Sequence, residues 1–350
     1  MLRLIFTCLC LLLSFNTCLA ESRPKVGISL PLSGPLASMG QSFRRGFEMY
    51  QSEHPTDTSG VEILFDDHRY DGKQAVSSFH QMTGAAGVDF FTAWGNLPAE
   101  TLAPIAESSK VPALFFTNLP VAKDRKYVVT MGNRAEGTVQ ACADFLKASQ
   151  ARNPAALTVN VGNAIAVVDA VKEKLSGELL VLSFEPDLTS FQPLILRMKK
   201  ASVDKLILFA LPDQALAYAR QAATLKFLPG TIGGDLFADK AFLANAKPLF
   251  SSVSFVYGKV NPEFIQSYQK YSGDFSFFFE AASGYSLAEI IYKQIGNSSP
   301  QPTNWMEALR GTEMNKLPLV GAHLTESPDD GLRLECDSAV YKSENLPVIH

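Results

Sequence analysis

The sequence predicts an α/β protein with two domains, each built on a doubly wound parallel sheet. Short apolar segments alternate with amphipathic segments along most of the chain, which is the pattern of repeated βαβ units. This alternation runs as far as Met131 and then starts again, so a second unit of similar size is expected. A length of 350 residues is also long for a single compact core, which favours two domains.

The composition is that of an ordinary globular protein with a weak negative charge. Hydrophobic residues make up 47% of the chain and charged residues 19%, and the formal net charge is −4. A protein that binds nucleic acid needs a basic surface, so this balance argues against a nucleic-acid partner. No segment after residue 20 is an apolar run long enough to cross a membrane.

The first 20 residues are predicted to be a signal peptide rather than part of the fold. Arg3 supplies a positive charge, and Leu4–Phe15 form an apolar stretch too short to span a bilayer. Cys18–Ala20 suits a small-residue cleavage site before Glu21. The alternative is a lipoprotein acylated on Cys18, but Phe15–Thr17 lack the small residue that such a signal needs. We therefore expect a periplasmic protein that is secreted through a cleaved signal peptide.

Two cysteines, Cys142 and Cys336, remain after cleavage. Two cysteines in a chain of this size do not form a disulfide framework. Cys142 lies in an apolar helical segment, which is typical of a small core residue.

The first element of the mature chain is a strand, a loop and a helix between Lys25 and Tyr50. The strand is an apolar run of β-forming residues that ends at Pro31. One helical face then carries four large apolar side chains at spacings of four, four and three: Met39, Phe43, Phe47 and Tyr50. Loops after the strands line the ligand crevice of open α/β sheets, so Ser33 and Gly34 are expected there.

The remaining elements follow from the same two patterns. Apolar runs predict strands at 61–65, 88–94, 111–116, 127–131, 156–161, 178–184, 205–211, 230–235 and 253–258. Amphipathic segments predict helices at 73–84, 98–109, 134–149, 167–175, 191–201, 212–225, 262–271, 281–295 and 305–309. The segment 319–350 predicts a β-hairpin that turns at Asp329–Gly331.

Several short segments, in a fixed order, resemble one known family. They are Lys25–Ile28 with Leu32–Pro35, Gly46, Asp66–Asp67 with Lys73–Val76, Leu102–Glu107 with Val111–Pro112, and Pro262–Tyr268 followed by an alanine-rich helix. Together they resemble the periplasmic solute-binding proteins of the branched-chain amino acid and amide type, which serve ABC transporters. The resemblance covers the chain from about Pro24 to the C-terminus.

This resemblance implies two α/β domains joined by a three-crossing hinge, with the ligand cleft between them. The implied N-terminal domain is 24–132 plus 260–318, and the implied C-terminal domain is 133–259 plus 319–350. The crossings would lie near Met131–Asn133, Lys259–Asn261 and Pro318–Gly321. The terminal hairpin would then belong to the second domain.

Polar side chains at predicted strand exits are the candidate ligand contacts. Asn96 offers a donor and an acceptor at a helix entrance, where backbone N–H groups attract anions. The negative charge of Glu100 partly cancels the positive field of that helix end. Asp235 follows two glycines at a strand end and could bind a cation or an amide N–H group. Ser33, Thr117 and Asn118 could bind a ligand or cap their own turns. Helix capping is likewise the alternative role for Asn96 and Asp235.

A second group of candidates comes from apolar positions and from the resemblance. Trp94 ends an apolar strand and could form a stacking wall of the cleft or belong to the core. The resemblance implies further contacts where this sequence lacks the usual hydroxyl or aromatic residue, and these positions are Met39, Leu97, Asn163 and Leu211. It also matches Asp235 to the residue that pairs with a ligand ammonium group.

The sequence gives little support to a metal site or an enzyme. Asp66, Asp67, His68 and Asp71 cluster in the sequence, but adjacent side chains at a strand end point in opposite directions. We expect no metal and no cofactor. Nucleophile elbows, phosphate-binding glycine loops and paired-cysteine zinc patterns are not present in the sequence.

These observations favour an exported binding protein that closes on a small polar ligand, amino-acid-like or amide-like. The resemblance implies that it delivers the ligand to an ABC-type permease, and we expect a monomer. Two alternatives stay open, a sensory receptor domain of the same fold and an α/β enzyme.

Overall fold

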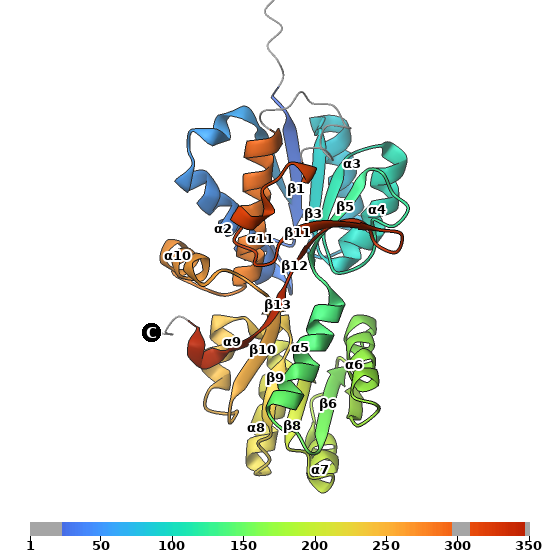
Figure 1. Ribbon diagram of the computed structural model, residues 1–350, viewed down its shortest axis with the longest axis vertical. Helices are drawn as coiled ribbons and strands as arrows, with labels where there is room; N and C mark the ends of the chain where they lie inside the picture. The colour runs from blue at the N-terminus through green and yellow to red at the C-terminus, as the bar shows by residue number, and fades with distance from the viewer. Residues whose placement is uncertain (1–22, 296–308, 347–350) are drawn as a thin grey trace, which may run out of the picture.

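The computed structural model describes residues 23–295 and 309–346, and these form two lobes stacked along the long axis (Figure 1). Each lobe is a mainly parallel sheet flanked by helices, which confirms the predicted fold class. The proposed signal peptide and the predicted helix at 305–309 lie almost wholly outside the described residues.

The first lobe contains the N-terminal βα units and most of the C-terminal segment. Its strands are β1 (Lys25–Leu30), β2 (Glu62–Asp67), β3 (Phe90–Trp94), β4 (Ala113–Phe116), β5 (Val128–Asn133), β11 (His323–Ser327) and β12 (Gly331–Cys336). Its helices are α2 (Ala37–Glu53), α3 (Gly72–His80), α4 (Asn96–Ser109), α10 (Pro262–Ser272) and α11 (Phe278–Ile290), with short turns η1 (Asp57–Gly60), η2 (Gln81–Ala86), η4 (Ile291–Ile295) and η5 (Met314–Lys316).

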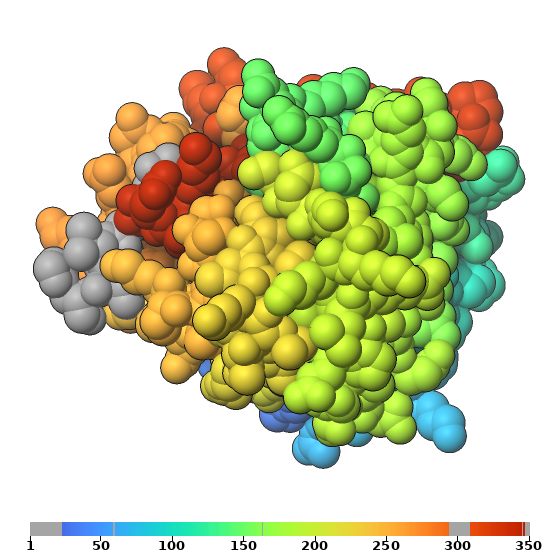
Figure 2. Space-filling model, turned by 90° about the horizontal axis from the view of Figure 1, so that it is seen from below, coloured from blue at the N-terminus to red at the C-terminus, as the bar shows by residue number. Residues whose placement is uncertain are grey.

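The second lobe repeats the pattern with the middle of the chain. Its strands are β6 (Pro154–Val159), β7 (Leu180–Phe184), β8 (Lys205–Phe209), β9 (Gly230–Gly233), β10 (Val253–Gly258) and β13 (Ser338–Lys342). Its helices are α5 (Ala135–Ala148), α6 (Gly162–Lys174), α7 (Gln192–Lys200), α8 (Pro212–Thr224) and α9 (Lys240–Ala246), with turns η3 (Asp235–Phe237) and η6 (Ser343–Asn345). Seen from its free end, this lobe presents mainly the green and yellow part of the chain (Figure 2).

Both sheets are doubly wound and direct their strand exits at each other. The orders are β11-β12-β5-β4-β3-β1-β2 and β13-β10-β9-β8-β6-β7. β5 ends at Asn133, where the chain enters the second lobe, and β10 ends at Gly258, where it returns to the first. Because β1–β5 and β6–β10 are parallel within their sheets, their carboxyl ends all face the boundary between the lobes.

The helices α2 and α11 cross at unusually short range in the first lobe. An ideal Cβ on Gly46 would lie 1.9 Å from the Ala281 carbonyl oxygen, and one on Gly284 would lie 2.0 Å from that of Phe43. Both glycines therefore allow backbone contact that no other residue would permit. The crossing buries the apolar face of α2 that the sequence predicted, which includes Phe43 and Phe47.

Two of the segments that join the lobes, at Lys259 and Asp337, hydrogen-bond to each other and to the neighbouring segment at Val320. The Lys259 N–H donates to the Asp337 carbonyl at 2.7 Å, the Asp337 N–H donates to Val320 at 3.0 Å, and the Val320 N–H donates to Lys259 at 2.9 Å. The three segments thus form one hydrogen-bonded set of backbones at the boundary, a suitable pivot for rotation of one lobe against the other.

The C-terminal hairpin differs from the prediction. It turns at Asp329–Gly331 as expected, but β12 pairs in parallel with β5, so the hairpin belongs to the first sheet. Only β13 reaches the second sheet, where it pairs antiparallel with β10. The third crossing is therefore at Asp337, and the segment near Pro318–Gly321 lies beside the crossings without passing between the lobes.

Buried Arg333 of β12 explains why the hairpin stays with the first lobe. Its side chain is 1% exposed, and its guanidinium donates to the carbonyl oxygens of Thr117 at 3.1 Å and Asn133 at 3.3 Å. These carbonyls belong to the exits of β4 and β5. Arg134, at the start of the second lobe, forms ion pairs with Asp330 at 2.7 Å and with Glu335. The hairpin therefore contacts both sides of the first crossing.

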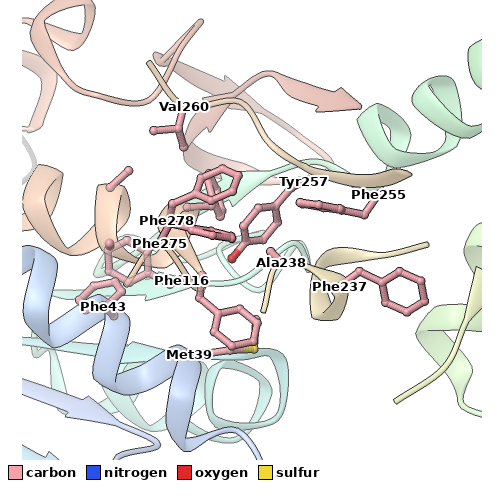
Figure 3. Packing of buried hydrophobic residues seen from close by; sticks show 14 of the residues in the cluster. Met39, Phe43, Phe116, Phe237, Ala238, Phe255, Tyr257, Val260, Phe275 and Phe278 are labelled. Carbon is pink, nitrogen blue, oxygen red and sulfur yellow. The ribbon is translucent and has the colours of Figure 1, made fainter. Parts of the chain in front are cut away.

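Aromatic side chains fill the boundary next to the crossings (Figure 3). One hydrophobic cluster includes Met39 and Phe116 of the first lobe together with Tyr257 of the second. The Tyr257 ring lies 5.1 Å from that of Phe278, centroid to centroid. The predicted ligand contact Met39 is 3% exposed and belongs to this packed cluster.

The sequence analysis did not predict helix α9. It begins after Asp239, whose carboxylate accepts a hydrogen bond from the Phe242 N–H at 2.6 Å. Among the helices that the structure describes, none has the length and apolarity that crossing a bilayer requires.

Candidate functional site

Tyr70 lies in the turn after β2 and packs against the residues at the end of β3. It therefore connects the carboxyl ends of these two strands at the boundary between the lobes. Arg69 and Tyr70 both adopt left-handed backbone angles, with φ of 51° and 59°. This turn places the Tyr70 ring over Gly95, where an added Cβ would lie 2.4 Å from a ring carbon. The ring centroid lies 6.0 Å from that of Trp94, at an interplanar angle of 52°. Gly95 therefore has two reasons to be glycine, this contact and its own φ of 111°.

The Tyr70 hydroxyl faces the N-terminus of α4. The backbone N–H groups of Asn96 and Leu97 donate toward it and lower its pKa, although the larger effect of burial raises the pKa overall. The charges of Asp235 and Glu100 raise the pKa further. The Tyr70 ring thus lies against Gly95, the residue that precedes α4.

His68 holds the turn that positions Tyr70. It is fully buried, its Nδ1 accepts from the Tyr70 N–H at 3.0 Å, and its Nε2 lies 3.1 Å from the Trp94 carbonyl oxygen. The two contacts require a neutral ring with the proton on Nε2. Burial is the main reason that the His68 pKa falls from 6.5 to about 4.

This depressed pKa predicts a loss of stability in mild acid. The unfolded chain takes up a proton near pH 6.5, whereas the folded protein keeps His68 neutral to about pH 4. The stabilisation is therefore complete above pH 6.5 and is lost as the pH falls toward 4. We expect wild type to lose about 3 kcal/mol more unfolding free energy than His68→Gln between pH 7.5 and pH 4.

Chemical denaturation at both pH values measures this difference. His80 is exposed, so His80→Gln is the matched control and should follow the wild-type pH dependence. Equal slopes for wild type and His68→Gln would contradict the neutral buried histidine.

The exits of β3 and β4 hydrogen-bond to each other through two predicted residues. The Thr117 hydroxyl donates to Asn96 Oδ1 at 2.7 Å and accepts from the Leu119 N–H at 3.1 Å. Thr117 is buried and Asn96 is half-buried, which leaves the amide nitrogen of Asn96 as the group available for a ligand. Leu97 follows with its side chain 42% exposed.

Asp235 approaches this region from the second lobe. It begins η3 after Gly234, and its Oδ1 accepts from the Leu236 N–H at 2.9 Å. The side chain is accessible to solvent, and yet desolvation raises the pKa of its carboxyl group. The alternative role predicted for Asp235 was to cap the following helix. That helix is α9, and its cap is Asp239.

Glu280 supplies a second carboxyl group that the sequence analysis missed. It lies in the first turn of α11, is 3% exposed, and its Oε2 has no hydrogen-bond partner among the described residues. Burial and then the charge of Asp235 raise its pKa well above the usual range. We refer to Tyr70, Trp94, Asn96, Leu97, Asp235 and Glu280 as the interlobe site.

The other predicted contacts lie outside this set. The Ser33 hydroxyl is bound to Asp67 Oδ2 at 2.5 Å, so it supports the loop after β1. Asn118 is exposed beside Thr117, and Leu211 is 47% exposed at the start of α8. Asn163 lies in the first turn of α6, and its side chain is outside what the structure describes.

The structure does not form a metal site from the acidic cluster in the sequence. Asp67 accepts from Ser33 and from the N–H groups of Leu32 and Arg69, while Asp71 caps α3. Across the described ranges, 23–295 and 309–346, no group of His, Cys, Asp and Glu side chains is placed to hold a metal ion.

Two doubly wound lobes with facing strand exits and three crossings define a type I periplasmic-binding fold. The chain belongs to the periplasmic binding protein family, whose model matches residues 24–341. This match confirms the resemblance that the sequence motifs indicated.

Solved structures share the fold at low sequence identity. A leucine binding protein LivK from Thermotoga maritima is 19% identical with a TM-score of 0.74, covering 91% of this chain and 94% of its own. LivJ from Streptococcus pneumoniae in complex with isoleucine is 16% identical with a TM-score of 0.75, covering 92% and 100%. A solute binding protein from Rhodopseudomonas palustris in complex with p-hydroxybenzoic acid is 19% identical with a TM-score of 0.73, covering 92% and 93%. No match was found among curated proteins.

Proposed function

We propose that this protein is an exported solute-binding protein that captures a small polar ligand, amino-acid-like or amide-like, between its lobes. It then delivers the ligand to an ABC-type membrane permease. The observation that carries the proposal is that the strand exits of both lobes face one boundary, with Asn96 following β3 of the first lobe and Asp235 following β9 of the second. A ligand that contacts both lobes binds the closed arrangement more tightly and so shifts the population toward it.

The relatives support this role and leave the ligand open. The ligands of two of them, isoleucine and p-hydroxybenzoic acid, share little chemistry beyond an acidic group and an apolar body. The interlobe site offers apolar side chains for such a body, Trp94 and exposed Leu97. We propose Asp235 as the principal polar anchor of the second lobe, and Asn96 as a polar contact of the first.

Mass spectrometry of the compounds that co-purify with the mature protein tests the proposal. We expect one small molecule at close to one equivalent, released by denaturation and bound again after refolding. Titration calorimetry should then give a single site without turnover of the compound. Conversion of that compound into a product would instead favour an α/β enzyme.

A further inference from the structure

The helices of the second lobe all end at its free end, opposite the boundary between the lobes. Strands β6–β10 direct their carboxyl ends at the boundary, and a helix precedes each of them, so the C-termini of α5–α9 lie at the other end (Figure 1). Figure 2 shows this face of the molecule. We refer to the segments that join these helix ends to the next strands as the distal surface: 145–153, 172–179, 197–205, 221–229 and 244–252.

The distal surface is strongly basic, although the whole chain has a net charge of −4. Its segments contain ten Lys or Arg residues and three Asp or Glu residues. One of the three, Asp204, accepts hydrogen bonds from the backbone N–H groups of Arg152 and Asn153. Among the residues that the structure describes, none of the ten basic side chains forms an ion pair, and all but Lys205 are exposed. The ten are Lys147, Arg152, Lys172, Lys174, Arg197, Lys199, Lys200, Lys205, Lys226 and Lys247.

The helix dipole does not account for this charge. Basic residues are favourable near any helix C-terminus, because the helix dipole places partial negative charge there. The first lobe has the same geometry, since α2, α3 and α4 precede β2, β3 and β4. Its corresponding segments, 50–61, 80–89 and 106–112, contain four Asp or Glu residues and one Lys. Equivalent helix ends therefore carry opposite charge in the two lobes, which indicates a separate reason for the basic one.

Two exposed leucines lie among these basic residues. Leu196 is 53% exposed and Leu228 is 50% exposed, the largest exposed fractions of any large apolar side chain that the structure describes. Leu196 lies one turn before the end of α7, and Leu228 lies in the segment that leads into β9. The Lys199 Nζ donates to the Leu225 carbonyl at 2.7 Å, which joins the end of α7 to the end of α8. Apolar side chains surrounded by Lys and Arg are typical of surfaces that lie in a membrane interface.

We propose that the distal surface binds the anionic headgroups of a phospholipid membrane, with Leu196 and Leu228 entering the interfacial layer. Each Lys or Arg close to an anionic membrane strengthens such binding. Mobile headgroups can pair with charges that are spread over five helix ends, whereas an acidic protein would need a matching fixed pattern of carboxylates. The inference goes beyond the proposed function, because attachment at this end needs no ligand and leaves the boundary between the lobes uncovered.

Co-sedimentation of the mature protein with vesicles tests the inference. One set of vesicles contains phosphatidylcholine alone, and the other contains roughly one-third phosphatidylglycerol. At low salt we expect at least about tenfold tighter binding to the anionic vesicles, and we expect most of this difference to disappear at about 0.5 M salt. No binding to the anionic vesicles, or equal binding to both sets, would overturn the inference.

Charge reversal on the distal surface tests its assigned residues. We expect Lys200→Glu combined with Lys226→Glu to weaken binding to anionic vesicles by about tenfold or more. Lys110→Glu combined with Lys270→Glu is the matched control, because both residues are exposed on the first lobe and the net charge changes equally. The control should keep wild-type binding. An equal loss in both variants, or full binding by the Lys200→Glu/Lys226→Glu protein, would contradict the role of the distal surface.

The leucines distinguish a membrane from an acidic protein partner. We expect Leu196→Ser combined with Leu228→Ser to weaken vesicle binding by about threefold or more and to leave binding to poly-L-glutamate unchanged, because only the membrane offers an apolar layer. Unchanged vesicle binding by this variant, together with equally tight binding of wild type to poly-L-glutamate, would indicate an acidic protein and overturn the proposal.

Discussion

Replacing Gly46 with alanine is expected to lower the free energy of unfolding by about 3 kcal/mol, the upper part of the usual range for overpacking. The new Cβ would lie 1.9 Å from the Ala281 carbonyl oxygen, a contact that no rotamer can relieve because both atoms belong to rigid helices. The α2–α11 crossing must therefore widen. That widening would loosen the packing of Phe43, which is fully buried at the same crossing.

Gly84→Ala is the matched control for this prediction. Gly84 is also in a helical segment, η2, but an added Cβ there would meet nothing within 4 Å. We expect Gly84→Ala to change stability by no more than about 1 kcal/mol, with a gain favoured by the higher helix propensity of alanine. Equal unfolding midpoints for Gly46→Ala and wild type in urea would show that the two helices are not packed as described.

Replacing Asp235 with asparagine is expected to weaken binding of a cationic or zwitterionic ligand by roughly 30- to 1000-fold, or about 2–4 kcal/mol. The substitution keeps the shape and removes the charge, so the ligand ammonium group would be left buried with one fewer partner. Calorimetry measures the change directly. A neutral or anionic ligand should lose little affinity, or gain some.

Two controls make the Asp235 result interpretable. Glu178→Gln removes one negative charge from an exposed position away from the interlobe site and should leave affinity unchanged. The melting temperature of Asp235→Asn should also stay near that of wild type, because Asp239 and not Asp235 caps α9. If a folded Asp235→Asn protein kept full affinity for a cationic ligand, Asp235 would have no role in ligand binding. Its role would then be the hydrogen bond that it accepts from the Leu236 N–H.

The architecture was predictable because its signals are local. Each βα unit repeats an apolar run and an amphipathic run, and the face of α2 that carries Phe43 and Phe47 is buried as its spacing predicted. The hairpin was assigned to the wrong lobe because its deciding partner is distant in sequence. Arg333 pairs with Thr130 in parallel register, and no local pattern indicates that pairing.

The interlobe site was only partly predictable for a similar reason. Trp94 ends an apolar strand, and Asn96 and Asp235 follow apolar strands, so their positions could be inferred from strand exits. Tyr70 reaches the site only through two successive left-handed residues, which its sequence gives little reason to expect. Glu280 had a usable signal, a single carboxylate between Phe277–Phe279 and Ala281–Ala282, because a charge within an apolar run must find a partner or a function.

Small-angle X-ray scattering with and without the co-purified ligand tests most directly the claim that the two lobes close on a ligand. The crossings at Lys259 and Asp337 are hydrogen-bonded to each other and can act as a pivot, so closure should proceed by rotation of intact lobes. We expect the radius of gyration to fall at saturation while the circular dichroism spectrum stays the same. An unchanged radius of gyration at full occupancy, or a large change in secondary structure, would contradict this account.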